Sequence, residues 1–280
     1  MREMSNQKGY EERYCLFLDI LGFQSLIDKS VHPKADEAKG MTFTRLKGAL
    51  NAISDGVDYR EVNVISGKIE ESSRRATQFS DSVVVSYLKD EMGGNGMNSI
   101  IHDVHRLQLD LVTRGVFLRG AITSGLLHHD ENLVFGPALN EAVALEKLAN
   151  YPRVILDGQL LDEVGLKRFS NQEIGKEWSR TTDSMAIEDF DGLFYVDYFN
   201  VHPDDFNKNW YELRDYLENL RTMIKELANK KDPSIKVKHS WLRYKFNVMI
   251  KILRKNGCKK ICNHQVPDEE VLYFSAIKPF

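Results

Sequence analysis

Stretches in which apolar residues run together or alternate with polar ones predict several strands. The segment from Arg13 to Asp19 is almost entirely apolar, which is typical of a central strand that is buried on both faces. Residues 77–87 have the pattern of a β-hairpin with Ser80 and Asp81 at its turn, and residues 117–123 return to a strand pattern. The hairpin turn is expected to lie beside the first strand.

Helical spacing of apolar residues separates these strands. Phe23, Leu26 and Ile27 share one face of a helix that follows a turn at Gly22, and residues 42–53 and 98–113 repeat the same period. Helices and strands in this order predict an α+β fold with a βαββαβ core of the ferredoxin type.

The composition changes after Tyr198. Residues 210–228 are strongly helical, residues 230–238 form a basic linker that contains Pro233, and residues 239–255 predict a second helix. We therefore expect a main domain over residues 10–200 and a helical C-terminal appendage over residues 201–280.

The overall composition is that of a globular protein. A length of 280 residues with 42% hydrophobic positions is enough for a sizeable core. The net charge of −3 gives no reason to expect a nucleic acid or an anionic membrane as the main partner. The N-terminal residues are polar, and no segment approaches the length of a transmembrane helix, so a cytoplasmic location is expected.

Two aspartates are the strongest candidates for chemistry. Asp19 ends an apolar segment, and Asp81 stands in the sequence Phe-Ser-Asp-Ser at the hairpin turn. A carboxylate at the end of a hydrophobic strand costs desolvation free energy unless a cation meets it. Mg²⁺ and Mn²⁺ prefer oxygen ligands, so the pair indicates a phosphoryl-transfer site. Taken singly, each aspartate can instead cap a turn or a helix.

A segment with two histidines is a weaker metal candidate. His128 and His129, followed by Asp130 and Glu131, precede the next strand signal at Val134. Consecutive histidines at a hairpin tip usually contact water, so we expect these side chains to be solvated.

A third segment joins the two aspartates in a known pattern. Phe117-Leu-Arg-Gly-Ala-Ile-Thr-Ser-Gly125 is followed by Val134-Phe-Gly-Pro-Ala-Leu-Asn140-Glu-Ala-Val-Ala-Leu-Glu146. In this order and register the three blocks resemble the catalytic domain of class III nucleotide cyclases, the adenylate and guanylate cyclase superfamily. Within it they look most like the bacterial pyrimidine cyclases of antiphage signalling. The resemblance covers roughly residues 13–200.

The resemblance implies conversion of a nucleoside triphosphate to a 3′,5′-cyclic monophosphate and pyrophosphate, with two Mn²⁺ or Mg²⁺ ions per site. By resemblance, the metal ligands would be Asp19, Asp81 and the backbone carbonyl of Ile20. The β- and γ-phosphates would meet the backbone N–H groups of the turn after the first strand, at Gly22, Phe23 and Gln24.

Adenylate and guanylate cyclases carry an asparagine and, four residues later on the same helix, an arginine that stabilises the transition state. Asn140 matches the asparagine, but Ala144 stands at the arginine position. Lys147 shares the helix face of Asn140, and Arg153 follows just past the helix end, so either can supply the missing charge. Arg119 is a further candidate, and a structural ion pair is an equally good explanation of it.

The positions that read the base also differ from those of purine cyclases. Aligned on Asp81 and Gly136, the purine-reading lysine and aspartate are replaced by Thr77 and Leu133. These residues and Phe79 are predicted to contact the substrate, and a neutral pocket permits a smaller base. The Thr77 hydroxyl can donate or accept a hydrogen bond, so it does not by itself distinguish uracil from cytosine. UTP is preferred over CTP on the resemblance alone.

Three functions are therefore compared. The first is a pyrimidine cyclase that makes cyclic UMP or cyclic CMP as a second messenger in antiviral signalling. The second is a purine cyclase with an unusual pocket, and the third is a non-catalytic nucleotide-binding domain. The two aspartates argue against the third, because an uncompensated carboxylate pair is destabilising. Class III cyclases build each site from two subunits, so the resemblance also implies a homodimer.

Overall fold

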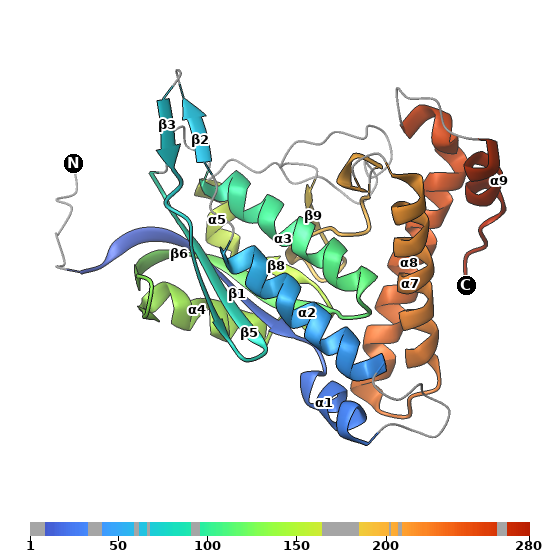
Figure 1. The fold of residues 1–280 in the computed structure, drawn as a ribbon, viewed down its shortest axis with the longest axis horizontal. Helices are drawn as coiled ribbons and strands as arrows, with labels where there is room; N and C mark the ends of the chain where they lie inside the picture. Colours follow the sequence, from blue (N-terminus) through green and yellow to red (C-terminus); the bar gives the residue numbers. More distant parts are fainter. Residues whose placement is uncertain are drawn as a thin grey trace.

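The computed structural model describes residues 9–32, 41–58, 62–65, 68–90, 96–163, 185–201, 203–206, 209–261 and 268–280. Figure 1 shows a twisted sheet between helices, with a group of C-terminal helices at one end. The strand order in the main sheet is β4-β5-β1-β6-β8-β10-β9, β7 pairs with β6, and β2 and β3 form a separate hairpin. The strands are β1 (Glu11–Ile20), β2 (Val62–Ile65), β3 (Lys68–Glu71), β4 (Arg75–Phe79), β5 (Ser82–Leu88), β6 (Leu118–His129), β7 (Val134–Phe135), β8 (Val154–Leu156), β9 (Ala186–Glu188) and β10 (Phe194–Val196).

Helices connect and cover these strands. They are α1 (Phe23–Val31), α2 (Met41–Asp58), α3 (Gly96–Thr113), α4 (Pro137–Glu146), α5 (Gly158–Glu163), the short 3₁₀ helix η1 (Pro203–Phe206), α7 (Trp210–Ala228), α8 (Pro233–Ile261) and α9 (Asp268–Ala276).

The first part of the chain has the predicted ferredoxin-like arrangement. The strands β4, β5, β1 and β6 are antiparallel neighbours in that spatial order. α1 and α2 lie between β1 and β4 along the chain, and α3 lies between β5 and β6. This is the βαββαβ topology, so the predicted α+β class is confirmed.

The central strand β1 divides its side chains between two differently covered faces. Leu16, Leu18 and Ile20 point to the face where they pack with residues of α2 and α3. Cys15 and Phe17 point to the opposite face and pack with α4. Because side chains alternate along a strand, Asp19 lies on the α4 face.

The helix α8 begins earlier than the sequence predicted. The carboxylate of Asp232 accepts hydrogen bonds from the backbone N–H groups of Ser234 and Ile235, at 2.7 and 3.3 Å. Asp232 therefore caps the helix, and Pro233 takes the first helical position, which proline tolerates. Most of the predicted basic linker is thus the first turns of α8.

One hydrophobic cluster joins the C-terminal helices to the sheet. It includes Leu217 and Leu220 of α7 and Phe246 of α8, together with Ile155 of β8 and Tyr195 of β10. The division of the chain at residue 200 stays a prediction, and the residues on either side of that position belong to the same cluster. No helix in the described part of the chain combines the length and the apolar character needed to cross a bilayer.

Candidate active site

The two aspartates lie at adjacent strand ends. Asp19 is opposite Ser82 in the β1–β5 ladder, and Asp81 occupies the turn just before Ser82. The backbone N–H of Ile20 donates to the carbonyl of Asp81 at 3.1 Å, and the Ser82 hydroxyl donates to Oδ1 of Asp19 at 3.4 Å. The expectation that the hairpin turn lies beside the first strand is therefore met.

The turn that carries Asp81 is short and strained. Phe79 and Ser82 are paired at the base of the hairpin, which leaves a two-residue loop. Ser80 has a φ of 56°, a left-handed conformation that costs a non-glycine residue about 1–2 kcal/mol. So short a loop leaves Asp81 little freedom to leave the end of β1.

Asp19 lies in a negative environment. Burial raises the pKa of its carboxyl, and the negative charges of Asp81 and Glu146 raise it further. The positive charge of Arg119 and the hydrogen bond from Ser82 act in the opposite direction but are outweighed. A cation beside Asp19 would relieve this repulsion.

The oxygen atoms around Asp19 fit a hard divalent metal. In an antiparallel ladder the N–H and C=O of one residue point to the same neighbour, so the carbonyl of Ile20 is directed to the side of Asp81. Within the described ranges, no group of three or more His, Cys, Asp or Glu side chains is placed to hold a metal ion. A metal held by Asp19 and Asp81 would thus take further ligands from backbone, substrate and water, as Mg²⁺ commonly does.

The turn after β1 exposes backbone donors. Gly22 has a φ of 77°, which lets the chain reverse sharply from β1 into α1. The hydrogen bonds of α1 begin with the N–H of Leu26, which donates to the carbonyl of Gly22 at 3.1 Å. The N–H groups of Phe23 and Gln24 precede this bond, so they can bind an anion at the helix N-terminus.

Arg119 connects the aspartate to α4. It is opposite Asp19 in the β1–β6 ladder, and its guanidinium forms an ion pair with Glu146, the last residue of α4. The structural ion pair that the sequence left open is therefore present. Glu146 is 5% exposed, and its importance was not apparent from the sequence because its partner is set by the strand register.

The other residues proposed to supply charge or orient the ribose lie in different surroundings. Asn140 and Lys147 are both exposed along α4. Arg153 is fully buried and forms ion pairs with Asp189, at 2.5 Å, and with Asp191. These contacts account for Arg153 without a role in catalysis.

A cation of the C-terminal part also approaches the site. Burial lowers the pKa of Lys238 in α8, and the positive charge of Arg119 lowers it further, so the two side chains are within electrostatic range. The basic composition around Lys238 predicts a linker, so the sequence alone gives this residue no role.

One of the predicted base-contacting residues, Thr77, contacts an unexpected histidine. Thr77 Oγ1 is 3.0 Å from Nε2 of His129, while Phe79 and Leu133 are 49% and 57% exposed. The expectation that His129 is solvated was wrong, because β6 continues to this residue and places it at 5% exposure. The preceding residue, His128, forms a hydrogen bond with Asp130 and is only partly buried.

Burial of His129 predicts an acid sensitivity. Desolvation, followed by the positive charges of Arg13 and Arg75, lowers the pKa of His129 to about 3, although Asp130 opposes this. In the unfolded chain a histidine has a pKa of about 6.5, so the unfolded state binds the additional proton first. The free energy of unfolding should therefore fall by about 1.4 kcal/mol per pH unit as the pH drops from about 6.5 toward 3, where the folded state also binds the proton.

Urea unfolding at several pH values measures this slope. His129→Gln should reduce the dependence of the free energy of unfolding on pH by about 1.4 kcal/mol per pH unit, the value for one proton. His128→Gln, whose side chain lies on the other side of the strand, should keep the wild-type dependence. An unchanged slope in His129→Gln would show that other groups dominate the acid response.

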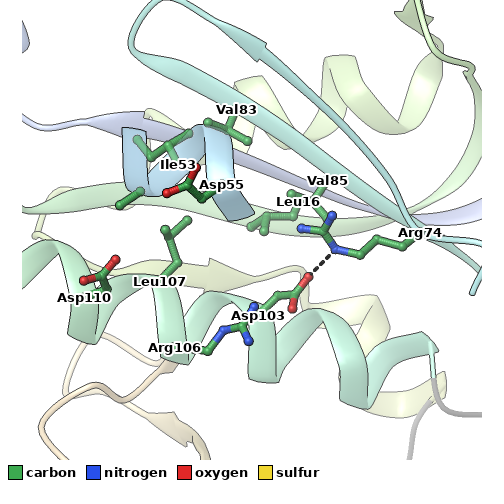
Figure 2. Close-up of a pocket in the computed structure, with 11 residues that line it drawn as sticks. Leu16, Ile53, Asp55, Arg74, Val83, Val85, Asp103, Arg106, Leu107 and Asp110 are labelled. Carbon is green, nitrogen blue, oxygen red and sulfur yellow. Dashed lines mark hydrogen bonds and ion pairs between the residues drawn. The ribbon is translucent and has the colours of Figure 1, made fainter. Parts of the chain in front are cut away.

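A separate cavity lies across the sheet from the aspartates. It has a volume of about 300 Å³ and is lined by Leu16 and Val83 of the sheet and by Leu107 of α3 (Figure 2). An ion pair between Arg74 and Asp103, at 2.8 Å, lies at its edge. Because Leu16 points away from the α4 face, this cavity does not belong to the site around Asp19.

The sequence matches no protein-family model and no curated protein. Among solved structures, the fold is similar to the adenylyl cyclase CyaB from P. aeruginosa, with 13% identity and a TM-score of 0.33 over 56% of this chain and 81% of that one. It is also similar to the catalytic core of a rhodopsin-guanylyl cyclase with converted specificity, in complex with ATPαS, with 13% identity and a TM-score of 0.37 over 67% of this chain and 95% of that one. At these values the similarity concerns the course of the chain and does not extend to activity.

Proposed function

We propose that this chain is a metal-dependent nucleotide cyclase that converts a pyrimidine nucleoside triphosphate to its 3′,5′-cyclic monophosphate and pyrophosphate. The observation that carries the proposal is the meeting of Asp19 and Asp81 beside the N-terminus of α1. An acid pair whose repulsion raises the pKa of Asp19 is suited to a cation, and a helix N-terminus is suited to a phosphate. The two features together fit a metal–triphosphate complex.

The proposed cofactors are two Mn²⁺ or Mg²⁺ ions per site, held by Asp19, Asp81 and the Ile20 carbonyl. When bound, such ions neutralise the triphosphate and lower the pKa of the ribose 3′-hydroxyl. In the reaction a bond forms between O3′ and the α-phosphorus, the bond from that phosphorus to the pyrophosphate oxygen breaks, and the hydroxyl proton is released.

Groups of the chain itself would position the substrate. The N–H groups of Phe23 and Gln24 would bind the β- and γ-phosphates, and Asn140 would orient the ribose. Arg119 brings positive charge close to Asp19, where negative charge would develop on the phosphate oxygens, and Lys238 lies within electrostatic range of Arg119. Lys147, exposed after Asn140, is the alternative source of that charge.

The neutral side chains of Thr77 and Leu133 support a pyrimidine substrate, and a second-messenger role in antiviral signalling follows the subfamily resemblance. The test is incubation of the purified protein with ATP, GTP, CTP and UTP in Mn²⁺, with products identified by mass spectrometry. A cyclic pyrimidine product is expected. A dominant cyclic purine product would support the alternative of a purine cyclase, and no cyclic product from any nucleotide would refute the cyclase proposal.

We further propose a homodimer in which one subunit supplies the aspartates and the other supplies Asn140. The exposed position of Asn140 and the exposed apolar side chains of Phe79 and Leu148 support an interface there. When Asp19→Ala and Asn140→Ala chains are mixed, half of the dimers are hybrids, and one of the two sites in each hybrid carries neither change. Mixing inactive variants should therefore restore about a quarter of the wild-type activity. No recovery after verified subunit exchange would contradict the shared site.

A further inference from the structure

Thr77 ends a chain of hydrogen bonds that starts at a buried cation. Nε of Arg13 donates to the hydroxyl of Ser86 at 2.9 Å, and this hydroxyl is 2.8 Å from Nδ1 of His129. On the other side of the ring, Nε2 is 3.0 Å from Oγ1 of Thr77. Arg13, Ser86 and His129 are 3%, 0% and 5% exposed, so water does not compete freely for these bonds. We call these four side chains the Thr77 relay.

Arg13 sets the direction of the relay because a guanidinium can only donate. The oxygen of the Ser86 hydroxyl accepts a hydrogen bond from Arg13, and the hydroxyl proton is still able to donate one. Among the residues that the structure describes, the side-chain hydroxyl of Ser86 contacts two partners, Arg13 and His129. A buried hydroxyl proton without an acceptor is unfavourable, so Ser86 donates to Nδ1 of His129.

His129 transmits this direction to Thr77. Its depressed pKa, about 3, leaves the ring neutral at neutral pH, with one proton. Since Nδ1 accepts from Ser86, the ring proton is on Nε2, which donates to Thr77 Oγ1. The hydroxyl proton of Thr77 is then left to donate to another group.

Thr77 is placed to meet the base of a nucleotide bound at Asp19. It is paired with Val84 of β5, which is paired with Phe17 of β1, two residues before Asp19. The two residues therefore lie on the same face, separated by two strand spacings and two residue steps, about 12 Å along the sheet. That separation is comparable to the reach of a nucleotide from its α-phosphate to the far edge of its base.

We propose that the Thr77 relay fixes Thr77 as a hydrogen-bond donor to the base, so that the site selects uracil over cytosine. The inference rests on the proposed function, because it takes Thr77 as the residue that contacts the base. The hydroxyl can donate a hydrogen bond to O4 of uracil. In cytosine the same position carries the N4 amine, which is also a donor, so no hydrogen bond forms between the two groups. A site built in this way rejects the analogue that leaves its donor unpaired.

The kinetic test compares kcat/KM for UTP and CTP in Mn²⁺. The wild-type protein should prefer UTP by at least ~10-fold. Thr77→Ser, which keeps the hydroxyl, should retain this preference, and Thr77→Val, which removes it at nearly the same volume, should bring the ratio close to one. Ser86→Ala should also lower the ratio, because it frees the His129 ring to adopt the other tautomer. Circular dichroism and thermal unfolding check that each variant is folded.

A second measurement does not depend on catalysis. The ¹⁵N NMR spectrum of histidine-labelled protein at neutral pH, with His129 assigned by comparison with His129→Gln, should show a proton on Nε2 and none on Nδ1. A proton on Nδ1 would overturn the relay whether or not any nucleotide is turned over. A UTP to CTP ratio at or below one, or a ratio that Thr77→Val leaves unchanged, would overturn the assignment of Thr77 as the donor.

Failure of the proposed function gives a different result. If none of the four nucleoside triphosphates is cyclised, the cyclase proposal fails. The preference for UTP over CTP is then measured as the ratio of their dissociation constants in Ca²⁺, obtained by calorimetry. Tighter binding of UTP that is lost in Thr77→Val supports the relay even then. Equal binding of both nucleotides, or no binding of either, refutes it.

Discussion

Replacement of Asp81 by asparagine is expected to reduce turnover by about 10³-fold or more while raising the thermal stability of the metal-free protein. The loss of activity follows from the loss of a proposed metal ligand next to the reacting phosphate. The gain in stability follows because the charge of Asp81 raises the pKa of Asp19, which means that the two carboxylates repel each other in the folded state. An amide is nearly isosteric and keeps the backbone bond between Asp81 and Ile20.

Opposite changes in activity and stability separate a functional pair from a structural one. Thermal unfolding with and without Mn²⁺ should show a metal-induced increase in Tm for the wild type that is absent from Asp81→Asn and Asp19→Asn. Asp110→Asn is a matched control, because this carboxylate is partly exposed and pairs with Arg114, the residue that follows the end of α3. Retention of more than a tenth of the activity in Asp81→Asn or Asp19→Asn would refute the two-aspartate site.

Replacement of Arg153 by methionine is expected to lower the free energy of unfolding by about 3–5 kcal/mol. Asp189, which is 3% exposed, accepts from Arg153 at 2.5 Å, from Nε1 of Trp241 at 2.7 Å and from Lys245 at 2.9 Å. Burial raises the pKa of Asp189, but its interactions with Lys245 and Trp241 outweigh burial and hold the pKa below the ordinary value. Removal of Arg153 would leave this buried charge with fewer partners.

Urea unfolding followed by tryptophan fluorescence measures this loss. The double variant Arg153→Met with Asp189→Leu should recover part of this loss, because the buried charge of Asp189 is removed together with that of Arg153. Recovery should be incomplete, because Lys245 loses its ion pair with Asp189. Arg114→Met removes an exposed arginine from an ion pair and should cost less than about 1 kcal/mol. A loss of similar size in both single variants would show that Arg153 contributes through something other than its buried ion pairs.

The parts of the site that the sequence predicted correctly are those with a local signal. The apolar run before Asp19 and the turn residues before Ser82 identify a strand end and a hairpin within a few residues of each aspartate. The helix start at Gly22 likewise follows from a glycine and the apolar period after it. These signals do not depend on distant parts of the chain.

The residues that the sequence did not identify depend on pairings between distant segments. His129 is buried because the β6 ladder continues past the predicted end at residue 123, and its partners Thr77 and Ser86 come from another hairpin. Glu146 matters because Arg119, from a different strand, lies beside it on the α4 face of the sheet. Nothing in the neighbourhood of these residues in the sequence specifies such partners.

The start of α8 is a different kind of error, since its signal was present. An aspartate directly before a proline, Asp232-Pro233, is a good N-cap and first-turn combination. The basic composition of residues 230–238 predicts a linker instead, and the predicted helix therefore begins after Lys238. The capping signal of Asp232 places Lys238 on the helix, whereas its proximity to Arg119 has no local signal.

The hydrophobic cluster that runs from β8 and β10 into α7 and α8 limits how this chain can change during evolution. Leu217, Leu220 and Phe246 cover sheet residues that would otherwise meet water. A recombination event that exchanged or deleted the segment after residue 200 would therefore expose part of the sheet's own interior, even if every residue near Asp19 were kept. The C-terminal helices and the sheet are thus expected to be inherited together, and substitutions in one are expected to be matched by compensating substitutions in the other.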